Sequence, residues 1–516
     1  MRRRPTGLEL GVLAAVLALG VLALPTPATG DQALFLVGAR EMAHGATYYR
    51  DFWDIKQPGI YWFYELARPL GGGILAVHVL ELVWQLGLAV LLQRAGRGLF
   101  RRPAVGAVLP LLVVGVYYAS ARPVNLTLIE GLVGLPLLGS LLLVWRAARS
   151  QRLALFAVAG LVGGVVPVFK VVEGALLLVV LVSGLVRLRQ TSASRAEQLR
   201  AAAAYAAGAA LPAVGVLGWA LARHELRLLV RTTLVYPPQV SALAGMHTTY
   251  ELHVAARQVA TSGTLLLALA VVALLPGVGR RLDLMTWSCL AWIAVGGGVI
   301  LLQKPNAYEV FLLLVPVGLL AAAGLQRVLD VVAERPRVAL RAGLAVAGLA
   351  LLLPTLSPLA AEVRVLGEHG GGVTSADRVA VGDAETDEYA DTSADLAAVH
   401  PLLPPGPVYV LGHPLLQQLL GAPSALELNG WSPEQFVPQQ WREWQRELER
   451  THPTVVFVDH GALPLVQQGA PEAMAYLRAH YRVVRTSPAA DRAGGTWWVT
   501  SLPPGPVAPH ADGTRL

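Results

Sequence analysis

The stretch GDQALFLVGAREMAHGATYYRDFWDIKQPGIYWFY, residues 30–64, directly follows an apolar N-terminal run and combines charged and aromatic side chains in one short segment. Its charged residues include four acids and one lysine that lie among aromatic neighbours: Asp31, Glu41, Asp51, Asp54 and Lys56. Charge at the point where an apolar helix leaves a bilayer is costly, so its presence there indicates a function. The segment is therefore the first candidate for a functional site.

The composition indicates a polytopic membrane protein. The 516 residues are 54% hydrophobic and 15% charged, and apolar runs recur that have about the length needed to cross a hydrocarbon core as helices. The formal charge of +7 comes largely from arginines in short segments between these runs, which is typical of topology signals, so nucleic-acid binding is not expected. Cys289 is the sole cysteine, which excludes an internal disulfide and a cysteine metal cluster.

Apolar runs bounded by arginine or proline predict eleven spans. They lie near residues 8–24, 74–93, 104–120, 126–145, 153–169, 171–186, 201–222, 262–278, 284–302, 308–325 and 338–357. The first run, preceded by Arg2 to Arg4, also has features of a cleaved signal peptide, but its length and the prolines at 25 and 27 favour an uncleaved span. The stretch 153–186 is interpreted as two short spans with Lys170 at their turn, because one long helix would place Lys170 and Glu173 in lipid.

The arginines also fix the predicted orientation. Connections with several arginines alternate with outer connections, of which the short ones carry a single cation each (Arg122, Lys170 and Lys304). The positive-inside rule therefore places the N-terminus in the cytoplasm and the first loop, 25–73, outside. Because the number of spans is odd, the chain after the membrane domain 1–357 also lies outside. The long outer loop 223–261 is interpreted as a mobile cover over the site.

The outer C-terminal part is predicted to be a small α/β domain. Residues 358–396 are expected to form a solvated linker and 397–503 the domain, while 504–516 form a flexible Pro/Gly-rich tail. Strand-like pieces at 408–411 and 454–458 alternate with helix-like pieces at 433–449 and 471–479. The predicted fold class is thus mainly α: a transmembrane helical bundle with a small extracytoplasmic α/β domain.

Several outer-face loops carry polar residues at the same predicted depth. These are Asp31, Asp51, Asp54 and Lys56 in the first loop, Glu130 near the start of span four, Lys170 and Glu173 after span five, and Lys304 and Tyr308 before span ten. Carboxylates can transfer protons and cations can bind phosphate, so a shared pocket for a polar head group is the functional hypothesis. The alternative is that charges simply survive at the ends of spans.

Two further patterns in the sequence contain histidines. His78, Glu81 and Gln85 stack on one face of the second span, and a structural hydrogen-bonded network is favoured over a proton path. His247 and His253 make only a weak pair in the long outer loop, so no metal site is expected.

The first loop resembles the corresponding loop of GT-C glycosyltransferases. The resemblance is carried by Asp31 soon after the first span, followed by the Asp-x-x-Asp-x-Lys-x-Pro-Gly pattern from Asp51 to Gly59 and the aromatic run to Tyr64. Weaker matches are Asn125 to Glu130, Gly163 to Lys170 and Gln303 to Tyr308, with Pro316 in span ten. The similarity is to the group of protein O-mannosyltransferases and lipid A aminoarabinose transferases, including bacterial mannosyltransferase-like enzymes, and it covers roughly residues 8–330.

The resemblance implies roles for individual residues. Asp31 would accept the proton of the acceptor hydroxyl, and Lys56 would hold the lipid phosphate, aided by Lys170 and Lys304. Many relatives have Asp-Glu where this chain has Asp31-Gln32, so a second carboxylate would come from Asp51, Asp54 or Glu130, or is not needed. The alternatives are a helix N-cap for Asp31, a snorkelling lysine for Lys56, and an aromatic belt for Tyr61, Trp62 and Tyr64, which is favoured over sugar stacking.

The predicted function is transfer of a sugar from a polyprenyl-phosphate carrier to an acceptor glycan, lipid or protein at the outer face of the cytoplasmic membrane. The lipid-linked sugar is the donor substrate, and no separate cofactor is expected. A transporter or flippase and a non-enzymatic cell-envelope assembly subunit are the alternatives. The absence of a visible inverted repeat and the gathering of charge at the outer surface disfavour a transporter.

Overall fold

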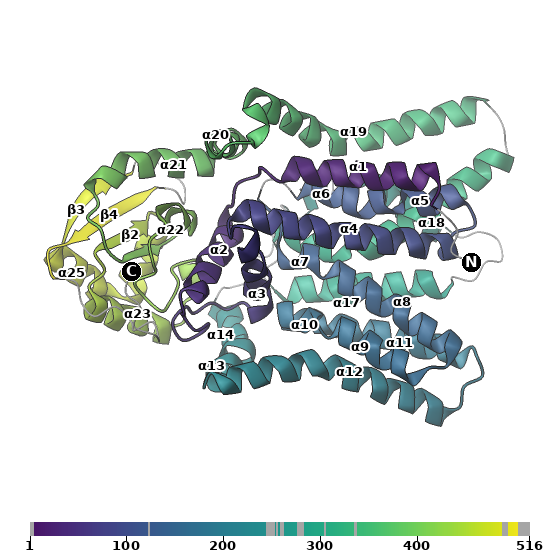
Figure 1. Ribbon diagram of the computed structural model, residues 1–516, viewed down its shortest axis with the longest axis horizontal. Helices are drawn as coiled ribbons and strands as arrows, with labels where there is room; N and C mark the ends of the chain where they lie inside the picture. Colours follow the sequence, from purple (N-terminus) through teal and green to yellow (C-terminus); the bar gives the residue numbers. More distant parts are fainter. Residues whose placement is uncertain are drawn as a thin grey trace. The chain divides into compact units, whose positions relative to one another are not determined.

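The computed structural model describes residues 5–121, 124–243, 253, 256–257, 263–275, 283–303, 306–334, 338–487 and 494–503. The chain forms two compact units, each built from three stretches of sequence (Figure 1). The first unit comprises residues 1–24, 78–217 and 247–364, and the second comprises 25–77, 218–246 and 365–516. Three of the boundaries fall within helices, namely α4 (Ile74–Leu99), α12 (Arg195–Ala222) and α19 (Val338–Glu368).

The first unit is a bundle of helices. Besides parts of α4, α12 and α19, its helices are α1 (Gly7–Ala23), α5 (Pro103–Pro110), α6 (Val116–Ser120), α7 (Ile129–Leu132), α8 (Gly134–Ser150), α9 (Leu153–Gly163), α10 (Val166–Phe169), α11 (Leu176–Arg189), α16 (Thr264–Leu274), α17 (Leu284–Leu302) and α18 (Leu314–Glu334). Shorter helical turns are η2 (Leu111–Gly115), η3 (Val171–Ala175) and η5 (Ala307–Leu313). Helix α18 packs against α5, α16 and α17, and α8 packs against α9 and α11.

The predicted class of a polytopic helical bundle is confirmed. In the described part of the chain, seven helical segments are long and apolar enough to cross a membrane, and three shorter apolar helices accompany them. The eleventh predicted span, 338–357, lies within α19. The helix after residue 153 breaks at Lys170, whose backbone is extended, as the two-span interpretation of residues 153–186 requires.

Small residues allow the helices of this bundle to approach closely. A Cβ atom added to Gly208 of α12 would lie 1.9 Å from the carbonyl oxygen of Ala157 in α9. On the facing side, a Cβ atom on Gly160 would lie 2.0 Å from the carbonyl oxygen of Tyr205. Because apolar burial adds little to helix association in lipid, this close contact between backbones supplies much of the packing energy.

The polar stripe of α4 forms a network, as predicted. The carboxylate of Glu81 accepts hydrogen bonds from the hydroxyl of Tyr117 and from the backbone nitrogen and hydroxyl of Thr127, the last two at 3.0 and 2.8 Å. The Gln85 amide donates to the carbonyl oxygen of Gly131 at 2.9 Å. These buried bonds tie α4 to the segments around α6 and α7.

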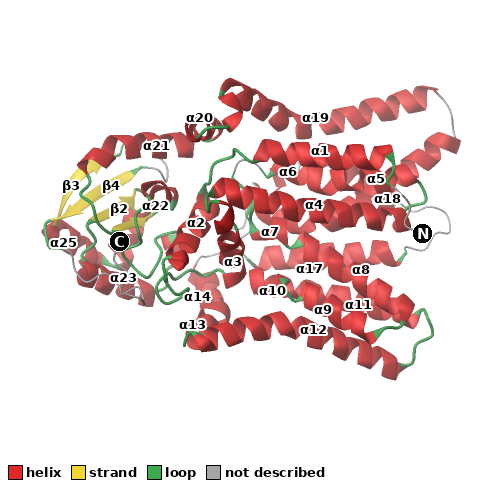
Figure 2. Ribbon diagram, in the orientation of Figure 1, coloured by secondary structure: helices red, strands yellow, loops and turns green. Residues whose placement is uncertain are grey.

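The second unit contains all the described strands (Figure 2). Its helices are α2 (Gly30–Ala43), α3 (Pro58–Leu66), α13 (Leu226–Val230), α14 (Tyr236–Leu243), α20 (Ser375–Glu385), α21 (Asp387–Val399), α22 (Leu415–Leu420), α23 (Pro438–Thr451), α24 (Ala462–Gly469) and α25 (Pro471–His480). Shorter turns are η1 (Arg68–Leu70), η4 (Arg231–Val235), η6 (Gly370–Gly372), η7 (His400–Leu402) and η8 (Pro433–Gln435). Its strands are β1 (Val408–Leu411), β2 (Val455–Asp459), β3 (Tyr481–Thr486) and β4 (Gly495–Thr500).

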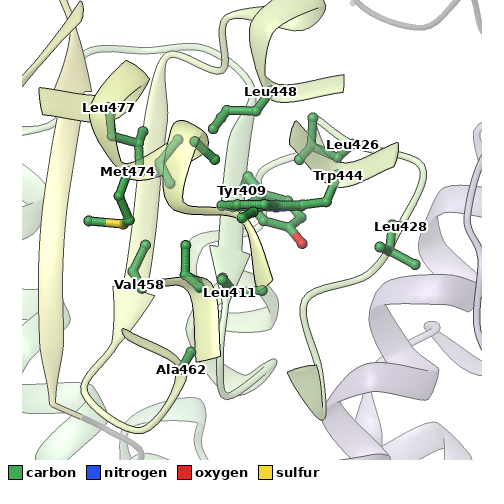
Figure 3. Packing of buried hydrophobic residues seen from close by; sticks show 14 of the residues in the cluster. Tyr409, Leu411, Leu426, Leu428, Trp444, Leu448, Val458, Ala462, Met474 and Leu477 are labelled. Carbon is green, nitrogen blue, oxygen red and sulfur yellow. The ribbon is translucent and has the colours of Figure 1, made fainter. Parts of the chain in front are cut away.

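The four strands form one mixed sheet in the order β1-β2-β4-β3, with β1 and β2 parallel and the other pairs antiparallel. Alternate residues of β1 point to opposite faces. Tyr409 and Leu411 pack with Trp444 and other residues of α23, α24 and α25, as Figure 3 shows, while Val408 and Val410 pack with Trp497 on the other face. Since both faces are covered, β1 and β2 read as continuous apolar runs in the sequence.

Residues 358–396, which the sequence predicts to be a solvated linker, are mostly helical. Helix α19 continues to Glu368, and α20 and α21 follow it. Both later helices have threonine N-caps, whose side chains accept hydrogen bonds from the backbone nitrogens of Asp377 and Tyr389. The spacing Thr374-x-x-Asp377 is a capping box, a helix-start signal in a segment whose polar composition suggested a linker.

Other expectations for this unit had mixed outcomes. The predicted strands at 408–411 and 454–458 are found as β1 and β2, and the predicted helices at 433–449 and 471–479 are found as α23 and α25, with small shifts at their ends. The sequence did not predict strands β3 and β4. Strand β3 is an edge strand with charged residues and lacks a clear apolar pattern. The first part of the loop 223–261 contains α13, η4 and α14, and the tail 504–516 lies outside the described residues.

Candidate functional site

The first loop brings Asp31 and Lys56 together. Asp31 lies in the first turn of α2, where its Oδ2 is 2.9 Å from the ammonium nitrogen of Lys56. The Asp31 side chain is 13% exposed and that of Lys56 is 25% exposed, so water still reaches the pair. The cap of α2 is formed by Thr29, whose backbone nitrogen donates to the side chain of Gln32 at 3.1 Å. The alternative role of Asp31 as the N-cap therefore does not apply.

A cluster of buried aromatic rings fixes the position of Lys56. The hydroxyls of Tyr48 and Tyr49 both donate to the Lys56 carbonyl oxygen, at 2.7 and 3.0 Å. Tyr61 packs against Tyr48 and Phe35 at centroid distances of 4.6 and 5.4 Å. Tyr61 and Tyr64 are fully buried, so neither serves as an aromatic belt or a sugar-stacking surface. They form the support of the site.

The other two acids of the loop have different environments. Asp54 is buried and accepts hydrogen bonds from the Tyr61 hydroxyl and from the backbone nitrogen of Ile55, both at 2.7 Å. Burial raises the pKa of Asp54 from its usual value, although the charge of Lys56 and the Tyr61 hydrogen bond oppose this shift. Asp51 instead closes a turn through Arg50 at 2.9 Å and the backbone nitrogen of Thr47 at 2.7 Å.

The C-terminal part of the second unit contributes a residue that sequence reasoning missed. The indole nitrogen of Trp431 donates to Oδ1 of Asp31 at 2.7 Å. Beside this contact, the buried ring of His413 meets the Trp431 ring edge-on at 5.0 Å. The Nε2 atom of His413 lies 3.2 Å from the backbone nitrogen of Gly30 and 3.0 Å from Oε1 of Glu388. Both carboxylate oxygens of Asp31 are thus engaged.

Backbone pairing with the first loop positions the Trp431 segment. The Trp53 nitrogen donates to the Glu427 carbonyl oxygen at 2.7 Å, and the Asn429 amide donates to the Trp53 carbonyl oxygen at 2.6 Å. The side-chain oxygen of Asn429 then accepts a hydrogen bond from the backbone nitrogen of Trp431 at 2.9 Å. Lys56 follows Trp53 by three residues, and Trp431 follows Asn429 by two. This pairing therefore places both partners of Asp31, Lys56 and Trp431, close to its carboxylate.

A glutamate of α23 also holds this segment. Oε2 of Glu447 accepts the backbone N–H of Glu427 at 3.0 Å. Burial, together with the charge of Glu427, raises the pKa of Glu447 from the ordinary value of 4.5 to about 7. Between these two pH values the folded chain binds a proton that the unfolded chain has lost.

The first unit contains a separate cluster around Lys170. Its ammonium nitrogen lies 2.5 Å from Glu130, 3.1 Å from Glu309 and 4.0 Å from Glu173, and all three carboxylates are buried. Glu309 was not among the predicted residues. Lys170 therefore already has three acidic partners, and its expected phosphate role stays a prediction.

The remaining predicted residues are placed as follows. Tyr308 precedes the buried Glu309, and its hydroxyl accepts a hydrogen bond from Asn306 at 3.3 Å. Lys304 and His247 lie outside the described residues. The first-loop residues belong to the second unit, whereas Glu130, Lys170 and Tyr308 belong to the first, so a shared pocket stays a prediction. Within the described ranges, no group of three His, Cys, Asp or Glu side chains is arranged to hold a metal ion.

Comparison with solved structures identifies the fold. The chain is similar to ArnT from Cupriavidus metallidurans, whose crystal structure contains undecaprenyl phosphate, with 14% identity and a TM-score of 0.56 over 96% of this chain and 98% of that one. An oligosaccharyltransferase from Archaeoglobus fulgidus, in complex with Zn and sulfate, gives 11% identity and a TM-score of 0.43 over 95% and 73% of the two chains, which is too low to support an argument. No family model matches, and a search of curated proteins gives no match.

The chain is a multi-pass membrane protein with a fold like that of ArnT, which agrees with the GT-C resemblance of its first loop. The narrower likeness to O-mannosyltransferases is not tested by these comparisons and stays a prediction.

The Lys170 cluster can be tested by removing its cation. We expect Lys170→Met to lower the thermal unfolding midpoint strongly, because breaking a buried ion pair costs about 3–5 kcal/mol. Adding Glu130→Gln and Glu309→Gln to that variant should restore part of the loss. Unfolding of the purified protein followed by tryptophan fluorescence measures both effects. An unchanged midpoint in Lys170→Met, with weaker donor binding, would instead support a phosphate role.

The protonation of Glu447 predicts a pH-dependent change in stability. The penalty for ionising this group grows as the pH rises from about 4.5 to about 7, and glutamine keeps an oxygen that can accept the Glu427 N–H. We expect Glu447→Gln to raise the unfolding midpoint at pH 8 and to leave it nearly unchanged at pH 4.5. Glu449→Gln, an exposed position on the same helix, is the control and should show no such difference. A lower midpoint for Glu447→Gln at pH 8 would contradict the assignment.

Proposed function

We propose that this protein is a glycosyltransferase that moves a sugar from a polyprenyl-phosphate carrier to an acceptor hydroxyl at the outer face of the cytoplasmic membrane. The contact that carries the proposal is the pair Asp31–Lys56, in the loop whose sequence resembles the first loop of GT-C enzymes. The likeness of the fold to ArnT, crystallised with undecaprenyl phosphate, supports a carrier of this class. The arginine-rich connections support the orientation.

The proposed reaction is a single displacement. The acceptor oxygen attacks the anomeric carbon while the bond from that carbon to the phosphate oxygen breaks, and the bonding electrons stay with the phosphate. Asp31 accepts the proton of the attacking hydroxyl. Because the leaving phosphate gains negative charge, a cation beside it in a partly dehydrated site lowers the barrier.

Lys56 can serve both groups. Its ammonium contacts Asp31 directly, so it lies beside the group that accepts the proton. Its positive charge stabilises the phosphate as the glycosidic bond breaks. The two roles of acid–base and electrostatic catalysis thus meet at one ion pair.

Trp431 acts in this proposal as a positioning residue for Asp31. Its N–H binds Oδ1 and thereby orients the carboxylate toward the hydroxyl of the acceptor. His413 packs edge-on against the indole ring, and Glu388 in turn contacts His413. The α/β part of the second unit is therefore needed for a correctly formed site.

Roles for the other predicted residues follow from their contacts. Asp54 anchors the loop that bears Lys56, and Asp51 closes the turn before it. Glu130 and Lys170 hold the helices of the first unit together. Lys304 and Tyr308 remain candidates for binding the donor.

The role of Asp31 is tested with Asp31→Asn. Without the carboxylate that accepts the proton, we expect transfer from a panel of polyprenyl-phosphate-linked sugars, supplied in membranes, to fall by roughly 10²- to 10⁴-fold. Asp391→Asn on the exposed face of α21 is the matched control and should keep full activity. An Asp31→Asn variant that is folded and transfers sugar at the normal rate would rule out the mechanism.

The role of Trp431 is tested with Trp431→Phe. This change removes one hydrogen bond to a charged group, worth about 1.5–3 kcal/mol, so we expect transfer to slow by about 10- to 100-fold. Losing a donor to the carboxylate should also move the acidic limb of the pH–rate profile to higher pH. Trp498→Phe, at a tryptophan whose indole N–H has no hydrogen-bond partner within the described part of the chain, is the control. A normal rate and an unshifted profile would refute the role of Trp431.

A further inference from the structure

The second unit contains a pocket that the proposed mechanism does not use. It has a volume of about 280 Å³ and is lined by parts of four segments, residues 49–53, 228–236, 427–428 and 437–447. We call it the Trp53 pocket. All four segments belong to the second unit, and the volume is close to the lower end of the range for small-molecule sites.

Two aromatic rings form a rigid corner of this pocket. The rings of Trp53 and Tyr236 meet edge-to-face with centroids 4.9 Å apart. The indole nitrogen of Trp53 donates to the Thr232 hydroxyl at 3.1 Å, and the Tyr236 hydroxyl donates to the carbonyl oxygen of Gln435 at 2.8 Å. Tyr236 is buried and Trp53 is half-buried, so a ligand meets mainly the apolar surface of the indole ring.

The charged side chains of the pocket have both signs. Arg50 and Arg231 bring two guanidinium groups, and Glu427, Glu443 and Glu447 bring carboxylates. A simple anion would meet the carboxylates, and a simple cation would meet the arginines. Neighbouring hydroxyl groups, in contrast, can donate to a carboxylate and accept from a guanidinium at the same time. The lining therefore suits a neutral ligand with many hydroxyls and an apolar face, which is the chemistry of a pyranose ring.

The pocket is also connected to Asp31 through the backbone. Its walls include Trp53 and Glu427, which are paired by the hydrogen bond from the Trp53 nitrogen. The same two segments continue to Lys56 and Trp431, the two partners of Asp31. A ligand in the pocket thus lies along the segments that carry the reacting groups.

We propose that the Trp53 pocket binds a neutral sugar ring of the acceptor, so that the acceptor is a glycan or a molecule that bears one. That the bound sugar belongs to the acceptor rests on the proposed function. The binding of a sugar to the pocket can be measured without any transfer. The indole ring of Trp53 stacks on the face of the sugar ring, and the arginines and glutamates bind its hydroxyls.

The test is saturation-transfer NMR on the full protein in phosphatidylcholine nanodiscs, since many detergents carry sugar head groups. The probes are methyl glycosides of glucose, galactose, mannose and N-acetylglucosamine, with methyl glucuronide as the anionic comparison. We expect at least one neutral glycoside to bind. The double variant Arg231→Gln/Glu443→Gln should weaken that binding at least about tenfold, the loss of a few hydrogen bonds to charged groups.

The matched control is the double variant Arg446→Gln/Glu449→Gln, which changes two exposed side chains of α23 that do not line the pocket. It should bind the glycoside as the parent does. The proposal is overturned if no neutral glycoside binds, if only the glucuronide binds, or if the pocket variant binds as well as the control.

Asp31→Asn separates the two proposals. We expect this variant to bind the glycoside normally while it fails to transfer sugar. Normal transfer by Asp31→Asn would overturn the proposed mechanism and leave the pocket result intact. Lost transfer in Asp31→Asn, with no glycoside binding to the parent protein, would overturn the pocket proposal alone.

Discussion

The structure of the second unit depends on the placement of one carboxylate between two donors. Asp31 receives an ammonium on one oxygen and an indole N–H on the other. A charged group in a site that is only partly open to water is stable only when such partners compensate for lost hydration. The aromatic cluster behind Lys56 and the paired segments at Trp53 and Glu427 keep these partners in place.

The two units solve the problem of buried charge in different ways. In the first unit, Lys170 is surrounded by three buried acidic side chains, which tie its helices together. In the second unit, Lys56 contacts Asp31 and is more exposed, with 25% of its side chain accessible against 16% for Lys170. The difference supports Lys56, rather than Lys170, as the candidate for phosphate binding.

Part of the candidate site was accessible from the sequence. Asp31 and Lys56 lie within one short segment, and their chemistry stands out beside an apolar helix. Trp431 lies 400 residues away from Asp31 and follows no motif, so its contact could not be inferred. Glu309 was missed for a similar reason, because its partner Lys170 lies in a distant part of the sequence. The helices at 375–399 could have been predicted from their threonine caps.

The sequence by itself determined that the chain is a polytopic helical protein with a polar first loop, because apolar length and charge asymmetry are local properties that each segment carries alone. It also determined the strands β1 and β2, whose apolar runs are continuous. Only the tertiary structure decided which acids surround Lys170, which indole holds Asp31, and where β3 pairs at the edge of the sheet. These contacts join segments whose local patterns are uninformative, so they emerge only when packing brings the segments together.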